Sequence, residues 1–208
     1  MHLSEYLESP CSKLSIPYWK NMVITIPENI KIVHQNDFSD KFLDEYCDER
    51  YFRLIHYLDN VDDKMINGFS VRTAELTDIP LIVEIINKSY TDLATSYEQI
   101  ISYTKTQVYD NNLWILVYEI KTNHIVGCGI ADYDSEAKEG ILEWIQVLPE
   151  YRDRKIGQLI VNQLLCRMKN ADFATVSGKV DNVTNPERVY RKCGFAGDDV
   201  WHILYKKC

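Results

Sequence analysis

The chain of 208 residues is 46% apolar and 26% charged, an ordinary composition for a globular protein, and its formal net charge is −8. This acidic balance argues against nucleic acid or an anionic membrane as the main partner. No apolar run approaches the roughly 18 residues that a transmembrane helix needs.

The first residues and the cysteines suggest a cytoplasmic protein, and the histidines give no sign of a metal site. The first residues, MHLSEYLESPC, hold two glutamates and no apolar run, so they do not resemble a secretory signal. The six cysteines form no CxxC or CxC pair, which is typical of reduced thiols in a cytoplasmic protein. The five histidines form no HxxxH or CxxH pair, so we expect no metal site.

Residues 1–68 are expected to form an N-terminal αβ extension that docks on the rest of the chain. NMVITIP at 21–27 and IKIVHQ at 30–35 alternate with period two around a Pro-Glu-Asn turn, which predicts two short strands or a hairpin. A helix capped by Ser39 should follow, because apolar side chains then recur at helical spacing. These are Phe42, Leu43, Tyr46, Phe52, Ile55 and Leu58. The polar stretch at 59–68 predicts a linker.

From residue 69 to residue 208 the pattern is regular and predicts one α/β domain. FSVRTAEL predicts a strand, and Thr77 should cap a helix through LIVEIINKSY, with a second helix in SYEQIISYTKTQ. Three strands follow, in LWILVYEI, IVGCGIADYD and GILEWIQVL. The last four elements are a helix from about Ile156, the strand FATVSGKVD, the short helix NPERVYRKCG and the strand VWHILYKK. This order predicts a mixed sheet with helices on both faces.

Basic residues gather where the helix near Ile156 begins. The stretch PEYRDRKIGQ, residues 149–158, contains Arg152, Arg154 and Lys155 directly before that helix. The first N–H groups of a helix lack intrahelical acceptors and attract anions, and Gly157 would let a ligand approach the backbone closely. A basic loop in contact with solvent alone would have the same composition, so spacing leaves both interpretations open.

The longer stretch EWIQVLPEYRDRKIGQLIVNQLL resembles the acyl-CoA-binding segment of the GNAT N-acetyltransferase superfamily, whose loop is Arg/Gln-x-x-Gly-x-Gly/Ala. NPERVYRKCGF resembles the next motif of that family, and VRTAELTDIP resembles its first element. The resemblance covers about residues 69–208 and implies a GNAT-type central mixed β-sheet. It places Lys155 at the first motif glycine. We expect this lysine to take helical geometry and to supplement phosphate binding, the alternative being a strained left-handed backbone.

The resemblance also implies how acetyl-CoA, the co-substrate, is bound. Its pantetheine would lie between the strands near 140–148 and 173–181, on backbone groups of Ile145, Gln146 and Val147. The loop and the first helical turn would hold the pyrophosphate, through Arg152, Asp153, Arg154, Lys155, Ile156, Gly157 and Gln158. Asn182 and Asn185 are candidates for polar contacts to the pantetheine, and turn or cap chemistry is the alternative for Asn185.

Two side chains are candidates for acid–base catalysis of acyl transfer to an amine. Glu143 is a carboxylate in an otherwise apolar strand, four residues before Val147 and on the same face, and is the candidate base. Its alternative role is an ion pair with a neighbouring strand. The resemblance places the Tyr190 hydroxyl near the CoA sulfur, where a phenol can protonate the thiolate. Its alternative role is a packed aromatic with a satisfied hydroxyl.

The sequence therefore predicts a cytoplasmic N-acetyltransferase that moves an acetyl group from acetyl-CoA to a primary amine of a small molecule or peptide. The alternative is a non-catalytic GNAT-like module that senses acyl-CoA or recruits a partner. Neither the acceptor nor the oligomeric state is specified by the residues.

Overall fold

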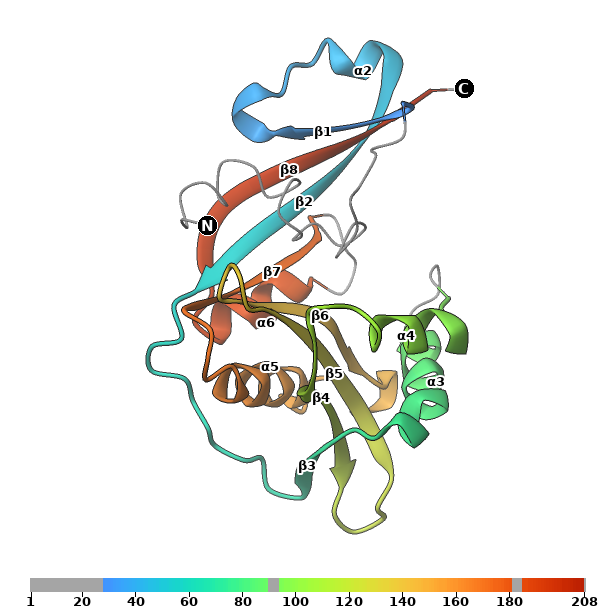
Figure 1. Ribbon diagram of the computed structural model, residues 1–208, viewed down its shortest axis with the longest axis vertical. Helices are drawn as coiled ribbons and strands as arrows, with labels where there is room; N and C mark the ends of the chain where they lie inside the picture. The colour runs from blue at the N-terminus through green and yellow to red at the C-terminus, as the bar shows by residue number, and fades with distance from the viewer. Residues whose placement is uncertain (1–27, 90–93, 181–184, 208) are drawn as a thin grey trace. The chain divides into compact units, whose positions relative to one another are not determined.

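The structure is a computed structural model that describes residues 28–89, 94–180 and 185–207 (Figure 1). Its elements divide between two compact units, one of residues 1–56 with 175–208 and one of residues 57–174. Strand β7, Phe173–Lys179, passes from the second unit to the first between Ala174 and Thr175. The strand predicted at 21–27 lies outside the described residues.

The unit of residues 57–174 contains a sheet with the spatial order β6-β5-β4-β3, in which each neighbouring pair is antiparallel. Its strands are β3 (Phe69–Thr73), β4 (Tyr109–Glu119), β5 (Ile125–Asp134) and β6 (Glu139–Val147). Its α-helices are α3 (Ile79–Ser89), α4 (Tyr97–Tyr103) and α5 (Ile156–Arg167), and the 3-10 helices η3 (Leu76–Asp78) and η4 (Pro149–Tyr151) precede α3 and α5. All of the predicted elements in this range are confirmed.

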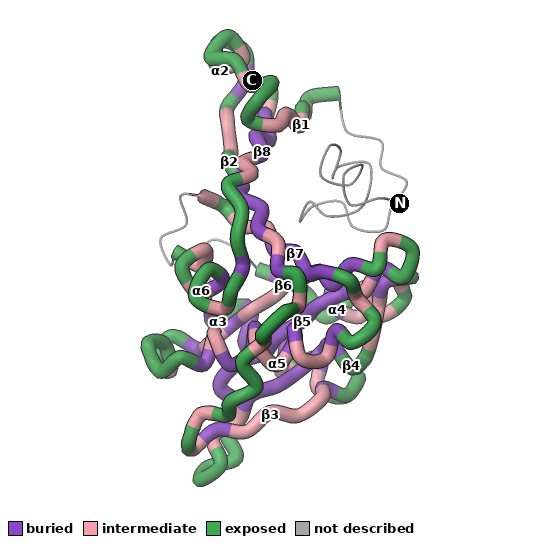
Figure 2. The backbone as a smooth tube through the Cα atoms, turned by 90° about the vertical axis from the view of Figure 1, so that its left-hand side faces the viewer, coloured by how far each residue is buried: buried purple, intermediate pink, exposed green. Residues whose placement is uncertain are grey.

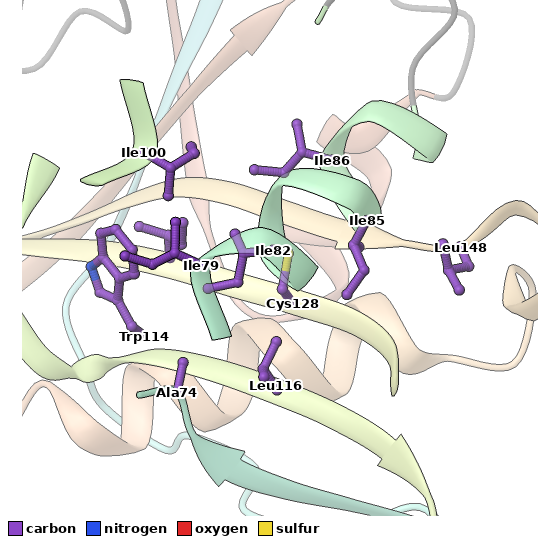
Figure 3. Packing of buried hydrophobic residues seen from close by; sticks show 11 residues of the cluster. Ala74, Ile79, Ile82, Ile85, Ile86, Ile100, Trp114, Leu116, Cys128 and Leu148 are labelled. Atoms are coloured by element: carbon purple, nitrogen blue, oxygen red, sulfur yellow. The ribbon is translucent and has the colours of Figure 1, made fainter. Parts of the chain in front are cut away.

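Helices α3 and α4 form a buried core with one face of this sheet. The apolar residues of α3 recur at helical spacing, and Ile79, Ile82, Ile85 and Ile86 are each at most 2% exposed. Figure 3 shows them gathered with Ile100 of α4 around side chains of the sheet, among them Trp114, Leu116 and Cys128. Burial raises the pKa of the Cys128 thiol to about 12, so this cysteine is a packing residue.

Helix α5 covers the opposite face of the same sheet. A Cβ added to Gly129 of β5 would collide with Ile160 of α5, and one added to Gly140 of β6 would collide with Met168, which caps α5. Strands β4 and β5, between these helices, therefore contain runs of consecutive buried residues, drawn in purple in Figure 2. Within the described ranges, no helix is both long and apolar enough to cross a membrane.

The start of α3 differs from the prediction, since Thr77 does not cap it. Glu75 is the cap residue of η3, and its side chain and that of Asp78 each accept a hydrogen bond from the backbone of the other. The Asp78 carboxylate also accepts from Arg72 Nη1 at 2.6 Å and Nη2 at 2.7 Å. These hydrogen bonds hold the pKa of Asp78 below its ordinary value.

The other unit is built from both ends of the chain. Its strands follow the order β1-β8-β2-β7, where β1 is Ile30–His34, β2 is Tyr46–His56 and β8 is Ala196–Lys206. The short helices η2 (Gln35–Asp37) and α2 (Phe42–Glu45) connect β1 to β2, and α6 (Pro186–Lys192) precedes β8. Strand β8 therefore has both of its antiparallel neighbours from the N-terminal extension.

The helix predicted between Phe42 and Leu58 is wrong. Helix α2 ends at Glu45, and the eleven residues that follow form β2. The stretch YFRLIH is rich in aromatic and branched side chains, which fit a strand, and β2 pairs with β8 from Tyr46 opposite Lys206 to Ile55 opposite Ala196. This long-range pairing outweighs the local helical spacing.

The α/β class with a mixed sheet is confirmed. The pairs β1–β8, β2–β8, β3–β4, β4–β5 and β5–β6 are antiparallel, while β6 leads to β7 through α5, a strand–helix–strand connection typical of parallel strands. The division into an N-terminal extension of residues 1–68 that docks on a domain of residues 69–208 stays a prediction.

We expect deletion of residues 1–68 to destabilise the remaining chain. The deletion removes both neighbours of β8, and it removes Phe52, whose ring would lie 2.7 Å from a Cβ added to Gly178 of β7. An unpaired strand and bare apolar surface favour association. Thermal unfolding and light scattering should show a lower melting temperature and oligomers. A deletion of residues 1–27, which retains β1 and β2, is the matched control. A monomeric 69–208 chain as stable as its parent would show a separable extension.

Candidate functional site

The predicted anion site lies between two buried apolar residues. Leu148 after β6 is 4% exposed and donates its backbone N–H to the Val126 carbonyl at 2.9 Å, and Ile156 at the start of α5 is 1% exposed. Residues 149–155 between them, which we call the β6–α5 loop, are exposed except for the half-buried Tyr151. The loop is therefore held at its ends and open to solvent along its length.

The backbone of this loop is left-handed at two residues that are not glycine. Asp153 has φ 62°, and Lys155, the N-cap of α5, has φ 63° and ψ 11°. The expectation that Lys155 takes helical geometry is wrong, because its φ and ψ lie in the left-handed region. A non-glycine residue in this conformation costs about 1–2 kcal/mol. Lys155 thus occupies the first motif glycine position in the conformation that a glycine would adopt without strain.

The first turn of α5 follows directly and presents backbone N–H groups. The Leu159 N–H donates to the Lys155 carbonyl at 3.0 Å, the first hydrogen bond of the helix. The N–H groups of residues 156–158 precede it, and helix geometry gives them no intrahelical acceptor. Gly157 lies in this turn. The end of the helix therefore carries the partial positive charge that attracts anions.

The three cations of the loop have different surroundings. Arg152 donates from Nη2 to the carbonyl of Ser89, the last residue of α3, at 2.8 Å. The Arg154 guanidinium lies over the Tyr151 ring, 4.9 Å from its centroid, in a cation–π contact. Lys155 is exposed at the N-cap of α5. The sequence predicts positive charge from all three around a bound anion, with a basic loop in contact with solvent alone as the alternative.

Two residues, Tyr151 within the loop and Ser89 beside it, make contacts that the sequence did not predict. The Tyr151 ring makes an edge contact with Phe69, at 6.4 Å between centroids, and a tilted contact with His124 at 6.0 Å. The Ser89 hydroxyl donates to the Ile85 carbonyl at 2.7 Å and lies 3.4 Å from the Val147 carbonyl. Tyr151 stands three positions before Arg154, a spacing that could have suggested their contact. No local signal marked Ser89.

Glu143 occupies an irregular position in β6. Ile130 of β5 lies opposite Trp144 while the next residue, Ala131, lies opposite Leu142, so Glu143 is the additional residue of a β-bulge. Before the bulge, Gly140 faces α5. After the bulge, Val147 lies opposite Gly127, which also faces α5, so Val147 is on the α5 side of the sheet as well. Counting by two from Val147 therefore does not place the Glu143 side chain. Bulges re-aim side chains and recur beside active sites.

The remaining predicted residues belong to the other unit or are not described. Tyr190 in α6 is 8% exposed, and its ring centroid lies 6.3 Å from that of Phe52 and 6.0 Å from that of Phe195. Asn185 is the N-cap of α6 with φ 45°, and its side chain makes no capping hydrogen bond within the described residues. Asn182 lies outside the described residues. The structure thus brings together residues 145–147 and 152–158 within one unit.

The described residues contain no group of three or more His, Cys, Asp or Glu side chains arranged to hold a metal ion. The absence of a metal cofactor remains a prediction.

Strand β6, an exposed basic loop with a left-handed N-cap and the twelve-residue helix α5 thus follow one another on an α/β fold. Comparison with solved structures identifies this fold as that of GNAT acetyltransferases. A GCN5-related N-acetyltransferase from Sphaerobacter thermophilus superposes with a TM-score of 0.70 at 18% identity, covering 85% of this chain and 58% of that one. A GCN5-related N-acetyltransferase from Kribbella flavida gives a TM-score of 0.60 at 12% identity, covering 86% and 68%.

A smaller neighbour is covered almost completely. The ribosomal-protein-S18-alanine N-acetyltransferase from Escherichia coli has a TM-score of 0.52 at 14% identity, over 66% of this chain and 93% of that one. Residues 110–196 match the family model described as the acetyltransferase (GNAT) domain, which confirms the predicted resemblance over this segment. Among curated proteins, no sequence matches the chain.

Replacing Lys155 with glycine should stabilise the protein relative to replacement with alanine. Both variants lose the same charge, but only glycine adopts φ 63° without strain. We expect the free energy of unfolding of Lys155→Gly to be about 1 kcal/mol higher than that of Lys155→Ala. For a chain of this length, this corresponds to a melting temperature about 2–4 °C higher. Equal or reversed stabilities, measured by thermal and urea unfolding, would indicate that the lysine backbone is helical after all.

Proposed function

We propose that the chain is an N-acetyltransferase that moves the acetyl group of acetyl-CoA to a primary amine. The observation that carries the proposal is the junction of β6 with α5, where an exposed loop with three cations leads into the first N–H groups of a helix, within the segment that matches the GNAT model. A diphosphate is the kind of anion that such a junction attracts. The identity of the amine is not encoded in this junction.

The residues of the junction fit the chemistry of acetyl-CoA. The backbone of residues 152–158 would hold the pyrophosphate, with Arg154 and Lys155 adding positive charge. The backbone of Ile145, Gln146 and Val147 would bond the pantetheine and stabilise charge on the thioester oxygen. Asn182 and Asn185 are proposed as further polar contacts to the pantetheine.

The proposed reaction needs a base for the amine and an acid for the departing sulfur. The amine nitrogen bonds to the carbonyl carbon, the carbon–sulfur bond breaks, and the electron pair leaves with sulfur. Glu143 takes the proton of the amine, directly or through water, and Tyr190 gives its phenolic proton to the thiolate. The position of Glu143 in a bulge supports a role beyond strand packing.

One observation favours the alternative of an acyl-CoA-binding module without turnover. Tyr190 is 8% exposed and packs among the rings of Phe52 and Phe195, as a purely structural tyrosine would. A module that binds acyl-CoA and transfers nothing would keep the junction and use this tyrosine for packing alone. The two functions differ in turnover and share the ligand.

We further propose that the protein works in the cytoplasm. Four of its cysteines, Cys47, Cys128, Cys166 and Cys193, are described and all are free, which fits a reducing compartment. The net charge of −8 favours amines over polyanions as the second partner.

Acetyl-CoA should bind and stabilise the fold. A ligand present at about 100 times its dissociation constant adds about 2.7 kcal/mol. For a chain of this length that raises the melting temperature by about 5–10 °C. A thermal-shift titration tests this, with acetate plus free adenosine as the control that lacks the pyrophosphate. An unchanged melting temperature up to millimolar acetyl-CoA would contradict both the acetyltransferase and the acyl-CoA-binding module.

Two variants should separate catalysis from packing, provided that an amine screen first identifies an acceptor by thiol release. Tyr190→Phe keeps the ring and should bind acetyl-CoA normally while turnover falls about 10²-fold, the lower end for a general acid. Glu143→Gln should reduce kcat/KM most at pH values below the pKa of the amine, with a deficit that shrinks as pH rises and free amine becomes abundant. Normal turnover in Tyr190→Phe would remove the tyrosine from the reaction. A pH-independent loss in Glu143→Gln with a lower melting temperature would assign that carboxylate to an ion pair.

A further inference from the structure

We infer that Arg152 is a positioning residue, which ties the β6–α5 loop to the end of α3 and leaves the phosphates of the co-substrate to its neighbours. This inference rests on the proposed function, since it concerns how the acetyl-CoA site is held in shape. Its direct basis is the hydrogen bond of 2.8 Å from Arg152 Nη2 to the Ser89 carbonyl.

The acceptor of this hydrogen bond is suited to a cation. Ser89 lies at the end of the described part of α3, and its backbone carbonyl is an acceptor that a guanidinium N–H can satisfy. Because donor and acceptor both belong to the protein, the hydrogen bond forms whether or not a ligand is bound.

The residue that Arg152 contacts is fixed to the rest of the site. Ser89 is 8% exposed, and its hydroxyl lies 2.7 Å from the Ile85 carbonyl within α3 and 3.4 Å from the Val147 carbonyl at the end of β6. The loop, the end of α3 and the end of β6 therefore meet at one buried serine. Through this contact Arg152 joins the segment proposed for pyrophosphate to the strand proposed for pantetheine.

The place of Arg152 in the chain explains what the tie would accomplish. It directly precedes the residues at 153–155, two of which have left-handed backbones. A strained loop persists only where its surroundings fix it. Anchored at Arg152 and at the buried Ile156, the loop keeps its amides in one arrangement before the ligand arrives. Arg154 and Lys155 remain as the cations of the loop that lie beyond this anchor.

An arginine has five N–H donors, enough to bond both the Ser89 carbonyl and a phosphate. The experiment must therefore distinguish the contact with α3 from a contact with phosphate. The experiment measures acetyl-CoA affinity by calorimetry for the parent, for Arg152→Met, and for the matched control Arg154→Met from the same loop. Each is measured at about 0.1 M and about 1 M salt, between which the screening length falls from about 10 Å to about 3 Å. We expect Arg152→Met to weaken binding about tenfold.

The ratio of variant to parent Kd is the decisive quantity. For a positioning residue the ratio of Arg152→Met stays constant with salt, because the lost contact is within the protein. For Arg154→Met the ratio should fall toward one as salt screens the phosphates. Arg152→Gln, which removes the charge but retains a polar side chain, is measured alongside. If the methionine variant does not fold, the ratio of the Kd of Arg152→Gln to that of the parent is compared at the two salt concentrations instead, with the same expected result.

Hydrogen exchange without ligand provides a readout that is independent of acetyl-CoA. Arg152→Met should speed the exchange of amides at the end of α3, around residues 85–89, about several-fold, while Arg154→Met leaves them unchanged. Unchanged exchange at α3, or a Kd ratio for Arg152→Met that collapses with salt, would overturn the inference. Failure of the parent itself to bind acetyl-CoA would instead overturn the proposed function, whatever the exchange of α3 shows.

Discussion

The packing of helices on both faces of strand β6 is the constraint on which the candidate site depends. Helix α3 covers one face of β5 and β6, and α5 covers the other. A strand packed on both faces cannot shift by one residue, because a slip would move every side chain to the opposite layer. Its end at Val147 is therefore fixed, and with it the point from which the chain must turn into α5. The packing of the core therefore determines where the β6–α5 loop lies.

The sequence was sufficient to predict the elements whose periodicity matches their burial. Helix α3 places isoleucines at 79, 82, 85 and 86, and the strands from β4 to β6 are apolar runs of the length that a doubly covered sheet needs. It was insufficient for β2, where Phe42, Tyr46 and Phe52 also suit a helix. The deciding energy is the pairing of β2 with β8, whose residues are about 150 positions away in the chain. No local pattern contains that information.

The same distinction applies to the site. The motif located the β6–α5 loop, because residue types at fixed spacing suffice to recognise a strand, a basic loop and a helix start. The φ of Lys155 and the bulge at Glu143 arise from the closure of the backbone between fixed ends and from the register of β6 against β5. Neither quantity has a residue signature here, since lysine and glutamate are both unusual in such positions. The partners of Arg152 and Arg154 depend on which segments the fold brings near the loop.

The strain at Asp153 and Lys155 is tolerable because the loop ends are strongly held. Two left-handed residues that are not glycine cost about 2–4 kcal/mol together. Leu148 and Ile156, at 4% and 1% exposure, flank them, and complete burial of such side chains contributes about 1.5–3 kcal/mol each. Relaxing the loop by withdrawing both anchors would lose about 3–6 kcal/mol of burial and recover about 2–4 kcal/mol of strain. The chain can therefore place a lysine where glycine would be free of strain, gaining a cation at the N-terminus of α5 for a cost that the adjacent core offsets.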